Sequence, residues 1–310
     1  MPRTRRMVIQ GVPGIYHVIS RTTLPGLPFK DADKDMLLSI IKKYSALFFV
    51  EILGFSLMGN HFHLVVNMMP EDRFTNEDLI KRLRNHYGGD FNPAESRIPD
   101  YKEKLCSLAH FMKEIKQAFS VYFNRAHKRR GTLWGERFKS VIVEKGAALI
   151  NCLAYVELNP IRAGLVKKPE AYKWNSIGYH VRTGNAGKFL SMDFGVLELR
   201  GENAEECIRK YREYVNEAGA VGRPDTPDVR KIQRSVIRKA RKKNFKPTRV
   251  ERFLTRNRYF TDSGVIGSKA FVSDKFDEFQ EVFQNPGKRK PKPIKGLDGV
   301  YSLKRLSEVI

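Results

Sequence analysis

The stretch VEILGFSLMGNHFHLVVNM, residues 50–68, decides the fold of the first half of this chain. Two apolar segments, residues 50–58 and 61–68, flank the dipeptide Gly59-Asn60. A Gly-Asn pair between two apolar runs is typical of a tight β-hairpin turn. The sequence therefore predicts two adjacent strands, and the second of them begins at His61.

The second strand carries two histidines, His61 and His63, which are two residues apart. Side chains at positions i and i+2 of a strand point to the same face, so the two imidazoles are expected side by side, with Phe62 on the other face. Two neutral imidazoles form half of a site for a divalent cation. The alternative is that the pair is fortuitous or packs in the core. A zinc-protease motif is absent, because no Glu separates the two histidines at helical spacing.

Strand-like and helix-like patterns alternate around this hairpin. Residues 15–20 alternate as in a strand, and a basic turn spans residues 127–131. Apolar residues recur at helical spacing in several stretches, and one further strand is expected. The expected helices are 31–48, 75–87, 102–125 and 146–158, and the expected strand is 138–144. This alternation predicts a mixed α/β domain.

A candidate nucleophile lies near the end of the last of these helices. Tyr155 and Asn159 are four residues apart and share one helix face, and Pro160 is expected to end the helix. A tyrosine hydroxyl, with an ordinary pKa of about 10, becomes a useful nucleophile only beside a group that stabilises charge, such as a metal ion. Asn159 offers a carbonyl oxygen as a third metal ligand. The alternative for Tyr155 is a packing role with a satisfied hydroxyl.

Tyr122 is the rival nucleophile. The residue four positions after it is Ala126, which cannot ligate a metal, and its aromatic neighbours favour packing. Tyr155 therefore ranks above Tyr122. The remaining histidines show no partner pattern and receive no role. They are His17, His86, His110, His127 and His180.

The composition points to an acidic partner. The 310 residues include 57 Lys and Arg against 34 Asp and Glu, a net charge of +23, and nucleic acid is the commonest partner of so basic a chain. No run of about 18 apolar residues is present, which argues against a membrane span and a membrane partner. Three scattered cysteines, Cys106, Cys152 and Cys207, do not form a disulfide framework and favour the reducing cytoplasm.

Several residues near these motifs are candidate DNA contacts. Arginine binds phosphate bidentately, and Trp134 could stack on a base or anchor the core. The N-terminal arginines could track DNA as an arm or form a disordered end. A solvated basic surface is the alternative for the others. The basic candidates are Arg3, Arg5, Arg6, Arg129, Arg130, Arg137, Lys139 and Arg162.

The C-terminal third differs in composition from the rest. Residues 229–258 contain 13 Lys and Arg against one acid, Glu251, a local net charge of +12. This predicts either a solvated tail or a DNA-contacting module. We expect two domains, residues 1–185 and a basic, mainly helical extension over residues 186–310. We also expect residues after about 220 to add DNA affinity without taking part in the chemistry.

Five motifs, in this order, resemble the REP-associated tyrosine transposases, which belong to the single-tyrosine branch of the HUH endonuclease superfamily. The resemblance covers roughly residues 1–180 and does not extend to the C-terminal third. The motifs are GIYHVISR (14–21), GNHFHLVV (59–66), GTLWGERFKS (131–140), YVELNPIRAGLV (155–166) and WNS (174–176).

This resemblance implies a ferredoxin-like α/β core with a central antiparallel sheet. It implies that His61 and His63 bind Mg²⁺ or Mn²⁺ and that Asn159 occupies the position of a polar third ligand. Tyr155 would attack a DNA phosphate, leaving a 5′-phosphotyrosine link and a free 3′-hydroxyl. The expected substrate is single-stranded DNA, in particular hairpins of palindromic repeats.

The leading hypothesis from the sequence is therefore a nucleoid-associated cytoplasmic transposase, a metal-dependent single-stranded DNA endonuclease and strand transferase. Two alternatives stay open. One is a replication initiator or relaxase, although the chain has no Gly-x-x-x-x-Gly-Lys-Ser/Thr loop for a helicase partner domain. The other is a non-catalytic DNA-binding regulator that keeps the fold. The sequence leaves both a monomer and a dimer open.

Overall fold

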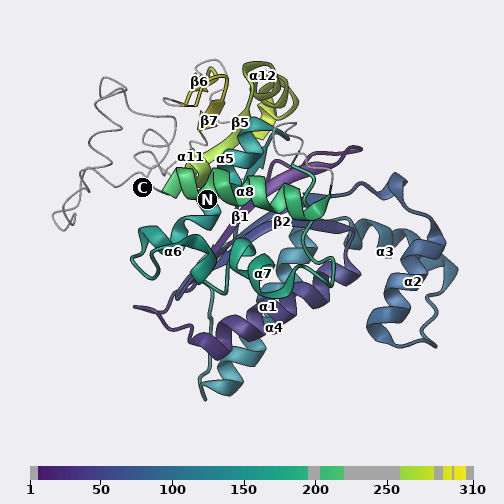
Figure 1. Cartoon of the computed structure of the whole chain (residues 1–310). Helices are drawn as coiled ribbons and strands as arrows, with labels where there is room; N and C mark the ends of the chain where they lie inside the picture. Colours follow the sequence, from purple (N-terminus) through teal and green to yellow (C-terminus); the bar gives the residue numbers. More distant parts are fainter. Residues whose placement is uncertain (1–5, 195–202, 220–258, 283–288, 295–296, 305–310) are drawn as a thin grey trace, which may run out of the picture. The chain divides into compact units, whose positions relative to one another are not determined.

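The structure is a computed structural model, and it describes residues 6–194, 203–219, 259–282, 289–294 and 297–304 (Figure 1). The chain divides into two compact units. We call Met7–Ile142 with Lys173–Asp193 the histidine unit, and the remainder, which includes Val143–Tyr172, the tyrosine unit. Each unit is therefore built from stretches that are separate in the sequence. The expected domain boundary near residue 185 stays a prediction.

The histidine unit contains the strands and helices that the hairpin and its neighbours predict. The paired strands β2 and β3 confirm the hairpin, with Leu57 opposite Phe62 next to the turn. The elements are β1 (Gly14–Arg21), α1 (Asp31–Leu47), β2 (Val50–Leu57), β3 (His61–Met68), α2 (Asn76–Tyr87), α3 (Ile98–Leu105), α4 (Leu108–Ala126), β4 (Lys139–Val143) and α7 (Ser176–Thr183).

These strands form an antiparallel sheet in the order β2-β3-β1-β4. With α1 between β1 and β2 and α4 between β3 and β4, the connection is the β-α-β-β-α-β pattern of the ferredoxin-like fold. Helices α1 and α4 pack against each other and lie side by side below the strands in Figure 1. The expected mixed α/β class with a ferredoxin-like core is confirmed.

The face of β3 opposite the histidines builds the core of this unit. Phe62, Leu64 and Val66 have no exposed surface. The Trp134 ring lies 5.5 Å from that of Phe62 and 5.7 Å from that of Phe119 on α4. The burial of these aromatic rings contributes strongly to the stability of the unit. It also leaves the opposite face of β3 for polar side chains.

One expected helix is two helices in the structure. The stretch over residues 102–125 is interrupted at Cys106-Ser107, which separates α3 from α4. The Ser107 hydroxyl accepts a hydrogen bond from the His110 backbone N–H at 3.4 Å, so Ser107 caps the start of α4. Apolar spacing continues across the break through Leu105 and Leu108, which is why periodicity alone did not reveal it.

The tyrosine unit combines helices with a small antiparallel sheet, in which β7 pairs with both β5 and β6. The expected extension beyond residue 185 therefore contains strands as well as helices. Residues 229–258, the most basic stretch, lie outside the described residues. The elements are α5 (Ala147–Glu157), α6 (Asn159–Arg162), α8 (Ala204–Gly219), α11 (Tyr259–Asp262), β5 (Ser263–Gly267), α12 (Lys269–Glu278), β6 (Lys292–Pro293) and β7 (Tyr301–Lys304).

Among the described residues, none of the helices combines the length and the apolar character that crossing a membrane requires.

Candidate metal and nucleophile sites

Strand register gathers polar residues around the two histidines. Arg21 on β1 lies opposite His61, and Ser56 on β2 lies opposite His63. Lys139 on β4 lies opposite Ile19, which is itself opposite His63. Because side chains alternate along each strand, these positions share one face of the sheet. We call this set the histidine face, and it consists of His17, Arg21, Ser56, His61, His63 and Lys139.

The His61 ring is held in one orientation by Asn60. The Asn60 amide nitrogen donates to the Gly26 carbonyl at 2.9 Å, which turns the amide oxygen toward the His61 Nδ1, 2.7 Å away. That oxygen can only accept, so the proton of neutral His61 is on Nδ1. The Nε2 atom of His61 then carries the lone pair that a metal ion requires, an arrangement typical of metal-binding histidines.

His63 is oriented in a similar way by a third histidine. The His17 Nε2 and the His63 Nδ1 are 2.9 Å apart, and the two rings stack with their centroids at 5.1 Å. Because Nδ1 of His63 is engaged with His17, a metal bond from His63 would use Nε2, the same atom that His61 has available. The His61 and His63 ring centroids are also 5.1 Å apart.

Burial of the histidine face affects the titration of His61. His17 is fully buried and His63 is 3% exposed. For His61, burial and then the charge of Arg21 lower the pKa to about 4. An imidazole must be neutral to ligate a metal, so His61 is in the required state across the physiological pH range.

The donor set fits half of a divalent-cation site. No group of three or more His, Cys, Asp or Glu in the described part of the chain is arranged to hold a metal ion. The two Nε2 atoms of His61 and His63 would therefore need further oxygen ligands, from an amide, water or a DNA phosphate. Mg²⁺ and Mn²⁺ both favour oxygen and keep several water ligands, which suits such an incomplete site.

Tyr155 lies on α5 in the tyrosine unit and is packed rather than exposed. Its side chain is 6% exposed, its ring stacks on Phe260 with centroids 5.3 Å apart, and the Arg162 guanidinium lies 4.1 Å from the ring centroid. Burial raises the pKa of Tyr155, although Arg162 lowers it in part. The hydroxyl is therefore protonated at neutral pH and needs activation before it can attack.

The end of α5 differs from the expectation. The helix ends at Glu157, and Asn159 and Pro160 begin the short helix α6. The Asn159 amide nitrogen donates to the carbonyls of Tyr155 and Val156 at 3.1 and 3.3 Å, and Arg162 also donates to the Tyr155 carbonyl. Asn159 thus satisfies orphan carbonyls at the helix end, which leaves its side-chain oxygen as the atom available for a ligand role. That role stays a prediction.

Tyr122 has a partner that opposes catalysis. Its hydroxyl hydrogen-bonds to the buried carboxylate of Asp33, which His127 also contacts at 2.8 Å. Burial raises the pKa of Tyr122, and the charge of Asp33 and its hydrogen bond to the hydroxyl raise it further. This environment disfavours the phenolate, as burial does at Tyr155, and the ranking of Tyr155 above Tyr122 stays a prediction.

The other predicted DNA contacts are dispersed. Trp134 is 8% exposed, and its indole N–H donates to the Lys116 carbonyl, so its ring belongs to the core. Arg129 donates to Asn124 and to the Thr132 carbonyl, which braces the basic turn. Lys139 is on the histidine face, and Arg162 is beside Tyr155. Arg130 and Arg137 are exposed, whereas Arg6 is half-buried. Arg3 and Arg5 lie outside the described residues. All of these DNA contacts stay predictions.

The structure thus brings the predicted residues together in two sets. His61, His63 and Lys139 lie on one sheet face of the histidine unit, whereas Tyr155, Asn159 and Arg162 lie together in the tyrosine unit. Sequence reasoning missed His17, Arg21 and Asn60. The signal for the first two is the register of β1 against β3, which places positions 40 or more residues apart on the same face.

Comparison with known proteins finds similarity to solved structures. No protein-family model matches this sequence, and no curated protein matches it. Among solved structures, a REP-associated tyrosine transposase bound to a REP hairpin aligns with 18% identity and a TM-score of 0.41, over 62% of this chain and 90% of that chain. A candidate transposase from Deinococcus radiodurans R1 aligns with 17% identity and a TM-score of 0.26, over 53% of this chain and 92% of that chain.

Proposed function

We propose that this protein is a transposase-type enzyme that cuts and rejoins single-stranded DNA with a divalent metal ion and a tyrosine nucleophile. The observation that carries the proposal is the histidine face, where Asn60 and His17 orient the imidazoles of His61 and His63. Arg21 and Lys139 add positive charge to the same face. Oriented neutral ligands beside cations are suited to a metal ion that must also bind a phosphate.

In this proposal His61 and His63 hold Mg²⁺ or Mn²⁺, with Asn159 as a candidate third ligand. The bound metal would supply Lewis-acid polarisation of the scissile phosphate. Because neutral histidines do not cancel its charge, the full charge is available to the phosphate oxygens. Arg21 and Lys139 would hold the flanking phosphate oxygens, as guanidinium and ammonium groups commonly do.

The covalent step breaks one phosphoester bond and forms another, so the number of these bonds does not change. The Tyr155 oxygen attacks phosphorus, the bond to the 3′-oxygen breaks, and the 3′-oxygen leaves as a hydroxyl after taking up a proton. The Tyr155 proton passes to water. Attack by a 3′-hydroxyl on the resulting 5′-phosphotyrosine rejoins a strand and needs no ATP, because the covalent link stores the bond energy. The proposed reaction requires Tyr155 to reach the phosphate held at His61 and His63.

The substrate is proposed from charge and from the resemblance in sequence. A net charge of +23 suits a polyanion, and the motifs resemble those of enzymes that act on hairpins of palindromic repeats. Single-stranded DNA of this kind, presented in the cytoplasm at the nucleoid, is the proposed partner. The proposal holds for a monomer and for a dimer.

A covalent adduct tests the proposal. The full chain is incubated with Mn²⁺ and a hairpin DNA labelled on the 3′ side of the cleavage site, and a labelled protein band is sought on a denaturing gel. We expect the band with the native chain and with Tyr122→Phe, the matched control, and its complete loss with Tyr155→Phe. Chelation of the metal should also remove it. An adduct that survives in Tyr155→Phe, or in the presence of chelator, would contradict the proposal.

One observation favours a second function, that of a DNA-binding regulator without catalysis. The Tyr155 hydroxyl is in a buried environment that raises its pKa, as in a structural tyrosine. A regulator would bind the same hairpins but give no adduct at any metal concentration. Hairpin binding measured beside the gel therefore separates the two functions.

A further inference from the structure

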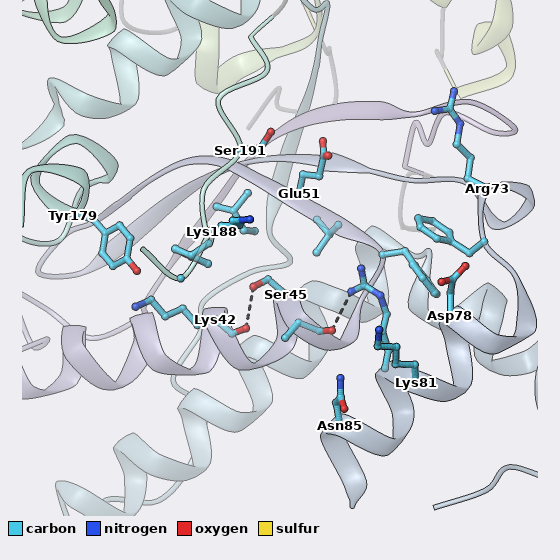
Figure 2. A pocket seen from close by; sticks show the side chains of 18 residues that line it. Lys42, Ser45, Glu51, Arg73, Asp78, Lys81, Asn85, Tyr179, Lys188 and Ser191 are labelled. Carbon is cyan, nitrogen blue, oxygen red and sulfur yellow. Dashed lines mark hydrogen bonds between the residues drawn. The ribbon is translucent and has the colours of Figure 1, made fainter. Parts of the chain in front are cut away.

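A pocket of the histidine unit lies where the edge strand β2 meets helices α1 and α2. It has a volume of about 890 Å³, within the ~300–1,000 Å³ range of ligand sites. Figure 2 shows Lys42, Tyr179 and Lys188 on one side of it and Arg73, Asp78 and Lys81 on the other. Every residue that lines it belongs to the same unit, so its shape does not depend on the tyrosine unit.

The charge around this pocket, which we call the edge pocket, is positive on balance, because its cations outnumber the acids Glu51 and Asp78. Five cations line it, and none of them forms an ion pair with a described residue. The cations are Lys42, Arg73, Lys81, Arg82 and Lys188.

The two acids in the lining are already engaged. The Glu51 carboxylate accepts a hydrogen bond from the Asn67 amide at 2.9 Å. The Asp78 carboxylate accepts from the backbone N–H and the hydroxyl of Thr75, which caps α2. Both carboxylates therefore have local structural roles, and the pocket retains a net positive charge that an anion would neutralise.

Arg82 is the most organised of the five cations. Its Nη1 atom donates to the carbonyls of Ala46 and Phe48 at the end of α1, at 3.0 and 2.8 Å, and its guanidinium lies 4.6 Å from the Phe49 ring centroid. The Nε and Nη2 atoms form no hydrogen bond with a described residue. A half-buried guanidinium fixed on one side, with donors left on the other, is arranged as phosphate-binding arginines are.

Aromatic rings accompany these cations. Phe74 and Phe49 stack with centroids 3.7 Å apart, and Phe74 is only half-buried. On the other side, the Lys42 ammonium lies 4.4 Å from the Tyr179 ring centroid and 5.5 Å from that of Phe189, which is also half-buried. Cations interleaved with partly exposed rings are typical of sites that hold a phosphate and stack a base.

We propose that the edge pocket binds a nucleoside phosphate. Inorganic anions and acidic peptides would use the cations but not the partly exposed rings of Phe74 and Phe189, whereas a nucleotide uses both. The nucleotide could come from a DNA strand or from the free pool. If the nucleotide is part of a DNA strand, the edge pocket gives DNA a second contact and so extends the proposed function. Binding of DNA to this pocket can be tested without metal and without cleavage.

The test compares two charge-matched double variants. Lys42→Gln with Lys81→Gln removes two pocket cations. The control, Lys43→Gln with Lys113→Gln, removes two exposed lysines that do not line the pocket, and Lys43 is next to Lys42 on α1. Binding of a fluorescent 15-nucleotide thymidine strand is measured by anisotropy in EDTA, at several salt concentrations. Arg73→Gln with Lys188→Gln, both exposed positions, serves as a second pocket variant if the first is unfolded by circular dichroism.

If the nucleotide comes from a DNA strand, we expect the pocket variant to bind the thymidine strand roughly tenfold more weakly. The slope of log affinity against log salt should also become shallower by about 1.4, because each of the two lost phosphate contacts contributes about 0.7. The control should change neither quantity. For a free nucleotide, calorimetric titration of dAMP should show saturable binding that only the pocket variant loses. Equal effects in the two variants, no effect with either probe, or loss of binding only to a poly-glutamate peptide would overturn the proposal. Because the measurement excludes metal, it stands whether or not an adduct forms.

Discussion

The histidine face and the tyrosine helix hold their functional side chains by different physical means. On the histidine face, hydrogen bonds from Asn60 and His17 orient His61 and His63. On α5, packing against Phe260 and Arg162 holds Tyr155, and burial raises its pKa. The first arrangement leaves the Nε2 atoms of His61 and His63 for the proposed metal ion. The second keeps the Tyr155 hydroxyl protonated, so the proposed attack would depend on the charge that DNA and metal bring to it.

Removal of the two imidazoles proposed to bind the metal should have the largest effect. His61→Ala and His63→Ala should each lower adduct formation by at least about 10³-fold, because the Lewis acid is worth several kcal/mol in the transition state. Thermal unfolding should change little for His61→Ala, whose side chain is half-buried. A variant that keeps its activity would show that these histidines are structural.

The next largest effect concerns the residues that orient the imidazoles. Asn60→Ala and His17→Phe should each weaken Mn²⁺ binding about 10–100-fold, the usual cost of losing such a partner. Calorimetric titration of Mn²⁺ measures this without DNA. Asn67→Ala, also on β3 but bonded to Glu51, is the matched control and should bind Mn²⁺ normally. Unchanged affinity in Asn60→Ala would mean that the His61 ring needs no external support.

A smaller effect is expected from the basic stretch over residues 229–258. Phe260 stacks on Tyr155, so deletion after residue 220 would disturb the nucleophile, and the charges are better removed by substitution. Changing six of the 13 Lys and Arg residues to Gln should make the salt dependence of DNA binding shallower and leave the adduct yield at saturating DNA unchanged. An unchanged slope would show that these charges do not contact DNA.

The smallest effect concerns stability. Burial lowers the pKa of His180 on α7 to about 4, whereas an unfolded histidine titrates near 6.5. The unfolded state therefore binds the extra proton first, and the histidine unit should lose on the order of 1–2 kcal/mol as the pH falls from 6.5 toward 4. His180→Gln should flatten this dependence in chemical unfolding curves. The same slope in that variant would assign the effect to another group.

Local sequence signals predicted the parts of the fold that depend on local physics. The Gly59-Asn60 turn and the apolar alternation around it located β2 and β3, and helical spacing located α1, α2 and α5. The break at Cys106-Ser107 was missed because the apolar spacing continues across it. The strands β5 and β7 were missed because each is only four or five residues long and has no marked alternation.

The candidate site was predictable only where its residues are close in sequence. His61 and His63 are two positions apart, and Tyr155 and Asn159 are four apart, so a single strand or helix determines how each pair is related. The roles of His17 and Arg21 depend on the pairing of β1 with β3, which no local pattern encodes. The Asn60 amide is also set by a distant partner, the Gly26 carbonyl in the loop after β1.

The proposed function requires that Tyr155 become covalently linked to DNA when metal occupies the histidine face. The most direct measurement is peptide mass spectrometry of the native chain after reaction with a hairpin DNA in Mn²⁺, followed by nuclease trimming of the attached strand. We expect one nucleotide-modified peptide, the one that contains Tyr155, and none in EDTA or in His61→Ala. A modification on Tyr122, or hairpin binding without any modified tyrosine, would contradict it.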